Sequence, residues 1–218
     1  MTHNKRLPAP KHYPINRKES SYVSEIKGSR SRDTAIPTVV FLREVTEYAD
    51  NAKEATKIVK EGKILRNGDK LRDIKQGIGV LDVVQFPDTE ESFRAVKQGK
   101  KLVFLPVTDG DKVAAKILDK SVEGDEFVYR LHNGENFRTE DEFSTGNTLV
   151  FNDSVKEVEL AEGNQALVIE GSHAGEKAEI KEINRRGMKP DTATVESDRE
   201  FETRLGNLVA VENLEVTR

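Results

Sequence analysis

Residues 51–68 read NAKEATKIVKEGKILRNG, and they specify a short helix followed by a tight hairpin. Asn51 is a good helix N-cap, because its side-chain oxygen can accept an otherwise unpaired backbone amide. Gly62 marks the end of the helix, since glycine enters the left-handed conformation without steric cost. A short strand over 63–66 and the turn signal Asn67-Gly68 follow. The stretch therefore predicts a capped helix joined to a hairpin.

The expected helix has two chemically different faces. At 100° per residue, Ala55, Ile58 and Val59 gather on one side, and three lysines lie opposite. Such a stripe can present cations to a phosphate backbone. A solvated helix face is the alternative interpretation. The lysines are Lys53, Lys57 and Lys60.

The charge around this helix favours nucleic acid, although a net charge of −4 is unusual for such a binder. Residues 1–32 carry eight Lys and Arg against two Glu, a net charge of +6, with few apolar side chains. They cannot bury enough surface to offset their ordering entropy, so we expect them to be unfolded alone and to order on RNA. A tail kept soluble by its charge is the alternative. The rings of His12, Tyr13 and Tyr22 are candidates for stacking on bases. The cations are Lys5, Arg6, Lys11, Arg17, Lys18, Lys27, Arg30 and Arg32.

Composition excludes several other classes of protein. The chain has no cysteine, hence no disulfide or thiolate metal site, and no apolar run long enough to span a bilayer. Its four histidines lack metal-ligand spacing, and residues 62–70 lack the Lys-Ser/Thr pair of a phosphate loop. No set of acid, base and nucleophile converges. We therefore expect a soluble, cytoplasmic, non-enzymatic protein without cofactor, metal, membrane or small-molecule substrate.

Residues 37–91 are predicted to form a small α+β domain, preceded by an N-terminal arm over residues 1–36. Apolar spacing predicts a first helix over 39–49, and a β-rich run over 78–86 follows the helix and hairpin. Residues 87–91 are turn-forming and acidic, which favours a linker.

The remaining residues are predicted to form two small antiparallel barrels, a central β domain over 92–160 and a C-terminal barrel over 161–218. The resulting fold class is α+β: a basic extended arm, a small α+β domain and two β-barrel-like domains. Turn signals lie at Asp109-Gly110 and Asn133-Gly134, and a basic loop covers 185–187. The expected strands are 93–97, 102–107, 127–132, 149–151, 165–170, 177–183, 200–204 and 207–211.

Three segments share a recognisable pattern in order along nearly the whole chain. They are residues 3–13 (HNKRLPAPKHY), residues 37–43 (PTVVFLR) running on through 79–83 (GVLDV), and residues 163–175 together with 201–211 (FETRLGNLVAV). The chain thereby resembles the archaeal and eukaryotic small-subunit ribosomal protein S-four, e-type family. The resemblance implies an S-four-type RNA-binding domain, a central β domain and a Src-homology-three-like barrel with a KOW motif.

The same resemblance implies a structural role in the small ribosomal subunit, with ribosomal RNA and neighbouring ribosomal proteins as partners. In the S-four-type domain the second helix and hairpin face RNA, with the first helix nearby. Ala178 stands where the KOW pattern usually has a glycine. A freestanding RNA-binding factor in translation or RNA modification is the alternative. The contacts that the resemblance implies outside the arm are Arg43, Lys53, Lys57, Lys60, Lys63 and Arg66. The clustering of positive charge near the basic loop adds Lys177, Arg185 and Arg186 as candidates.

Overall fold

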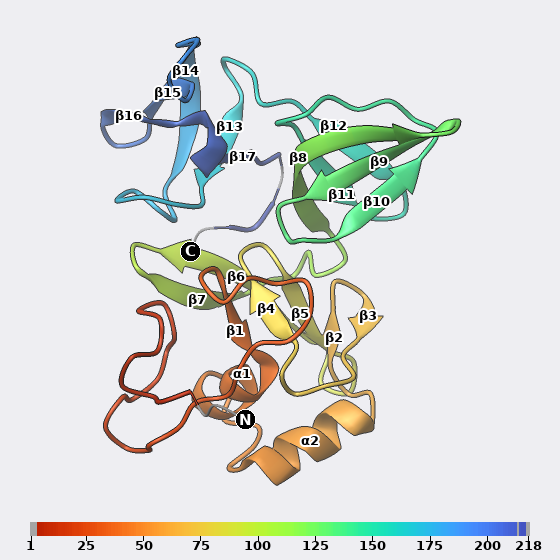
Figure 1. Ribbon diagram of the computed structural model, residues 1–218, viewed down its shortest axis with the longest axis vertical. Helices are drawn as coiled ribbons and strands as arrows, with labels where there is room; N and C mark the ends of the chain where they lie inside the picture. Colours follow the sequence, from red (N-terminus) through yellow and green to blue (C-terminus); the bar gives the residue numbers. More distant parts are fainter. Residues whose placement is uncertain (1–3, 213, 217–218) are drawn as a thin grey trace. The chain divides into compact units, whose positions relative to one another are not determined.

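Antiparallel strands make up most of the regular structure of the computed structural model (Figure 1). The structure describes residues 4–212 and 214–216, so His3, which begins the N-terminal segment quoted above, lies outside the described residues. The chain divides into unit 1, residues 1–96 and 100–110, and unit 2, residues 97–99 and 111–218.

Unit 1 packs α1 and α2 with a five-stranded sheet of order β3-β2-β5-β6-β7 and a short β1-β4 pair. Its core centres on Phe41 of α1. The centroid of the Phe41 ring lies 4.5 Å from that of Phe104 and 6.1 Å from those of Phe86 and Phe93. The elements are β1 (Ala35–Pro37), α1 (Thr38–Glu44), α2 (Ala52–Lys60), β2 (Leu65–Arg66), β3 (Asp69–Lys70), β4 (Gly77–Gly79), β5 (Val83–Phe86), β6 (Glu91–Gln98) and β7 (Lys101–Pro106).

The helix-hairpin prediction for residues 51–68 is confirmed. The side chain of Asn51 accepts hydrogen bonds from the backbone amides of Lys53 and Glu54, each at 3.0 Å. Gly62 has a φ of +71°, as expected for the residue that ends the helix. Asn67 and Gly68 have φ values of +55° and +86°, which is the conformation of a two-residue hairpin turn.

Replacing Asn51 by alanine removes this cap and is expected to lower the free energy of unfolding of unit 1 by about 1 kcal/mol. Asn51→Ser, which keeps an acceptor oxygen and adds no negative charge beside Glu54, is expected to remain close to wild type. Urea denaturation followed by circular dichroism measures both variants. Equal losses in the two would contradict the assignment of the cap.

Two sequence predictions for unit 1 are wrong at the boundaries of elements. The first helix, expected to reach residue 49, ends at Glu44. The Thr46 hydroxyl donates to the Leu42 carbonyl at 3.3 Å, and Glu47 has a φ of +55°, so the chain turns away. The expected linker over 87–91 is a hairpin turn that joins β5 to β6, so the predicted boundary after residue 91 falls inside one sheet.

The structure also contradicts the expectation that the arm is unfolded in the free protein. His12 and Tyr13 are buried in unit 1. The ring Nε2 of His12 donates to the Ala35 carbonyl at 2.9 Å, and its backbone carbonyl accepts from Leu102 at 3.2 Å. The arm has few apolar residues of its own, but contacts with β1 and β7 supply the burial that local composition cannot.

Unit 2 contains two five-stranded antiparallel sheets, ordered β10-β9-β8-β11-β12 and β16-β15-β14-β13-β17. Four of its strands, β8, β10, β12 and β15, were not predicted, because polar residues and alanines occupy half or more of their positions and weaken the hydrophobic signal. The elements are β8 (Val113–Glu123), β9 (Glu126–Leu131), β10 (Asn136–Thr139), β11 (Thr148–Phe151), β12 (Val155–Val158), β13 (Gln165–Val168), β14 (Lys177–Asn184), β15 (Thr192–Glu196), β16 (Glu200–Arg204), η1 (Leu205–Asn207) and β17 (Leu208–Ala210).

A buried lysine ties these two sheets together. Lys116 lies in β8, and its Nζ donates to the carbonyls of Leu205, Gly206 and Leu208 at 2.9, 3.3 and 2.6 Å. Burial lowers the pKa of Lys116 to about 8. Within the described part of the chain, no carboxylate forms an ion pair with this ammonium group.

Candidate nucleic-acid interface

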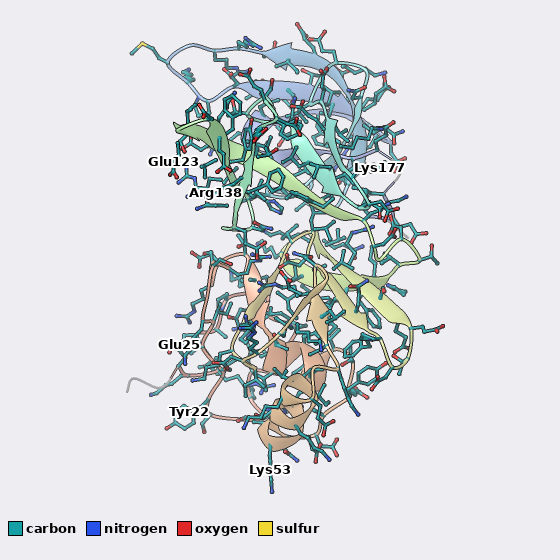
Figure 2. All side chains as sticks on the ribbon, turned by 90° about the vertical axis from the view of Figure 1, so that its right-hand side faces the viewer. Tyr22, Glu25, Lys53, Glu123, Arg138 and Lys177 are labelled. Carbon is teal, nitrogen blue, oxygen red and sulfur yellow. The ribbon has the colours of Figure 1, made fainter. Side chains whose placement is uncertain are left out.

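The lysine stripe of α2 lies on the solvent side of the helix, as the periodicity predicted. Ala55 and Val59 are buried against unit 1, whereas the stripe residues are exposed. In Figure 2 the side chain of Lys53 projects away from unit 1. Lys57 is 3.9 Å from Glu61, so its charge is only weakly compensated. We call Lys53, Lys57 and Lys60 the α2 stripe.

The hairpin after α2 contributes less free charge than expected. Lys63 lies between Glu61 at 3.2 Å and Asp88 at 3.6 Å, and its hydrogen bond to Glu61 raises its pKa. Arg66 is half-buried, and its guanidinium donates to the Gly77 carbonyl at 2.5 Å. Both cations are thus partly engaged within the protein.

Four of the predicted arm contacts are buried and face protein, which corrects their assignment to RNA. Arg6 pairs with Glu44 at 2.9 Å, and Arg30 pairs with Asp82 at 2.6 Å. His12 and Tyr13 lie in the core, and burial raises the pKa of Tyr13 to about 12. Sequence reasoning assigned these groups by charge and ring type, and only the long-range contacts reveal their structural use.

The other cations predicted in the arm and on α1 remain accessible to varying degrees. Arg17 is half-buried and donates to the carbonyls of Leu7, Ala9 and Pro10. Arg43 is exposed on α1, with its Nε 3.2 Å from the Asp50 carbonyl. The exposed lysines and arginine of the arm are Lys5, Lys11, Lys18, Lys27 and Arg32.

Asp82 organises the centre of unit 1, a role that no local pattern in the sequence indicates. Its carboxylate accepts from Nε and Nη2 of Arg30 at 2.8 and 2.6 Å, from the Asn67 amide at 2.7 Å and from the Gly79 backbone at 2.7 Å. Burial would raise the pKa of Asp82, but the hydrogen bonds and charge of Arg30 hold it below its ordinary value. This network anchors the arm to the hairpin turn beside α2.

The predicted cations of the C-terminal sheet do not form one uncompensated patch. Lys177 is half-buried, whereas Arg185 and Arg186 are exposed. Arg186 pairs with Glu202 through its guanidinium. Ala178 is buried in the core of this sheet, so a methyl group is accommodated at the position where the motif usually has glycine.

Over 4–212 and 214–216, no three His, Asp or Glu side chains are grouped as metal ligands. The same residues contain no helix that is both long and apolar enough to cross a membrane.

The fold is that of a small, mostly antiparallel β protein with an exposed lysine stripe on α2, and comparisons with known proteins identify its family. The KOW motif family matches residues 162–196, which span β13, β14 and β15. Proteins named small ribosomal subunit protein eS4 are similar to nearly the whole chain. That of Methanococcus aeolicus is 34% identical and covers 90% of this chain and 87% of the relative. The protein of Halobacterium salinarum is 31% identical, and the match covers 90% of this chain and 88% of that relative. The chain belongs to the small ribosomal subunit protein eS4 family.

A solved structure supports the fold independently. The crystal structure of the 30S ribosomal protein S4e from Thermoplasma acidophilum superposes with a TM-score of 0.70. It is 21% identical, and the match covers 82% of this chain and 95% of that one. At this identity the likeness concerns the fold alone.

Proposed function

We propose that this chain is a structural, non-catalytic component of the small ribosomal subunit in the cytoplasm, and that unit 1 binds the subunit's RNA. Membership of the eS4 family supports the assignment to the subunit. The observation that carries RNA binding is the exposed α2 stripe, which lies opposite the buried face of a firmly capped helix. Lysine ammonium groups make point-charge contacts with phosphates and do not read sequence.

The contact surface proposed for unit 1 extends from the α2 stripe to Arg43 and the exposed cations of the arm. Lys63 and Arg66 are placed at its margin, because each is already engaged with protein groups. In unit 2 the proposal is limited to Lys177, Arg185 and Arg186, since residues 161–218 contain more acidic than basic side chains. Neighbouring ribosomal proteins are the proposed partners of the acidic surface.

Charge reversal of the whole α2 stripe tests this proposal. The variant Lys53→Glu/Lys57→Glu/Lys60→Glu is expected to bind a transcript of the small-subunit ribosomal RNA more weakly. The slope of log affinity against log salt concentration should become shallower by about 2 to 3, because each phosphate contact contributes about 0.7 to 0.9 to that slope. Filter binding across a salt series measures both quantities.

A matched variant in unit 2, Lys156→Glu/Lys181→Glu/Lys189→Glu, changes the net charge equally but leaves α2 intact. It is expected to keep most of the wild-type slope. An unchanged slope in the α2 variant would refute the assignment of the interface. Sedimentation tests the alternative of a freestanding RNA-binding factor. Such a factor would dissociate from the small subunit in a salt wash, whereas a structural component would remain bound.

A further inference from the structure

A cavity of about 520 Å³ opens on unit 1 between the arm, α1 and the beginning of α2. Val39 and Val40 of α1, Val23 of the arm and Ile74 of the loop before β4 contribute its apolar surface. Its size falls within the range of small-ligand sites, which combine apolar walls with a few polar groups. The cavity could therefore hold a flat group about the size of a nucleobase.

The charged side chains that line the cavity leave a small cationic excess. Arg6 and Glu44 neutralise one another at 2.9 Å. Arg43 and Lys75 supply two further positive charges, and Glu25 supplies one negative charge. Arg43 uses one of its five donors on the Asp50 carbonyl. This balance suits a ligand that has an uncharged flat part and an adjoining anionic part.

Tyr22 lies at this cavity and is 57% exposed, in contrast to the buried rings of His12 and Tyr13. Figure 2 shows Tyr22 and Glu25 near one another at the surface of unit 1. The backbone around the ring is held, because Arg6 donates to the Ser21 carbonyl and Val23 donates to the Asn4 carbonyl, each at 3.0 Å. An aromatic ring on a held segment loses little entropy when a flat ligand stacks on it.

We infer that this cavity accepts one unstacked base of the bound RNA, with Tyr22 stacking on the base and with Arg43 and Lys75 near the adjoining phosphates. A nucleotide has the required combination of a flat apolar face, polar edges and an anionic backbone. The first residue of α2, Ala52, also lines the cavity, so the site adjoins the α2 stripe. The inference rests on the proposed function, since it requires unit 1 to bind RNA.

Replacing Tyr22 by alanine is the first test, with the same small-subunit RNA transcript as probe. Stacking on an aromatic side chain has an effect of roughly 5- to 150-fold on affinity, and we expect a loss in that range. The salt slope should not change, because no phosphate contact is removed. Tyr22→Phe keeps the ring and is expected to bind like wild type. Tyr48→Ala removes another exposed tyrosine of unit 1 that does not line the cavity, and it serves as the matched control.

A second variant addresses the cavity itself. Ala52→Leu adds side-chain volume at an exposed position on its wall, and it is expected to lower RNA affinity while leaving the salt slope in place. Ultraviolet crosslinking followed by mass spectrometry should attach Tyr22 to a nucleotide in a loop or bulge of the RNA. Crosslinks spread over many duplex positions would overturn the inference.

The outcomes separate the inference from the proposed function. If wild type binds with a salt slope that depends on the α2 stripe but Tyr22→Ala binds equally well, the base site is refuted and the interface stands. If wild type does not bind the transcript, the proposed function fails. If Tyr22→Ala and Tyr22→Phe lose affinity equally, the hydroxyl group rather than stacking is responsible, and the inference is overturned.

Discussion

Replacing Asp82 by alanine is expected to lower the free energy of unfolding of unit 1 by about 3 to 5 kcal/mol, because the buried guanidinium of Arg30 loses the carboxylate with which it is paired. Arg30 and Asp82 are both almost fully buried, and the amides of Asn67 and Gly79 donate to the same carboxylate. The loss should be visible as a lower urea midpoint. Hydrogen exchange should also show reduced protection of the arm amides that pack on unit 1.

Two further variants sharpen this prediction. Asp88→Ala removes an exposed carboxylate that lies 3.6 Å from Lys63, and its effect should stay within about 1 kcal/mol. Arg30→Met/Asp82→Leu replaces both charges by apolar groups and is expected to lose less stability than Asp82→Ala. A loss in Asp82→Ala no larger than in Asp88→Ala would show that the network does not anchor the arm.

Acid should act on wild type and on Asp82→Ala differently. Because the folded-state pKa of Asp82 lies below its ordinary value, its stabilising contribution is present in full above about pH 4 and is lost as the pH falls through the folded-state pKa. The difference in free energy of unfolding between wild type and variant should therefore narrow in acid. Urea titrations of both proteins at neutral and acidic pH measure that difference.

Replacing Lys116 by methionine is expected to lower the free energy of unfolding of unit 2 by about 2 to 4 kcal/mol at neutral pH. Methionine has a similar length but removes the three hydrogen bonds that the ammonium group donates to the carbonyls of Leu205, Gly206 and Leu208, and hydrogen bonds from a charged group contribute about 1.5 to 3 kcal/mol each. Relief of the buried charge offsets part of that cost. Lys156→Gln, at an exposed position in the same unit, serves as control.

Stability of unit 2 should depend on pH through Lys116. Burial lowers the folded-state pKa to about 8 from 10.5, so between these values the unfolded chain binds more protons and stability rises with pH. The advantage of wild type over Lys116→Met should grow by up to about 3 kcal/mol from pH 8 to pH 10.5. A constant difference across this range would contradict the assignment of a depressed pKa.

Local signals along the chain were sufficient to predict the α2 stripe and the hairpin that follows α2. The cap of Asn51, the left-handed Gly62 and the Asn67-Gly68 turn depend on neighbouring residues, and the structure has all three as predicted. The helical spacing of apolar and charged residues on α2 likewise predicted which face of the helix is buried. The family was also accessible from the sequence, because its segments recur in order along the chain.

Long-range packing decided what charge and composition could not. Arg6 and Arg30 are cations like Lys5 and Lys11 in the sequence, yet the first two meet carboxylates far along the chain and become buried. The arm is too polar to fold by itself, but it is ordered against residues that supply the missing apolar surface. The partners of Asp82 and Lys116 are likewise assembled only by the fold, since a buried ion or donor is defined by what surrounds it in space and not by its neighbours in the chain.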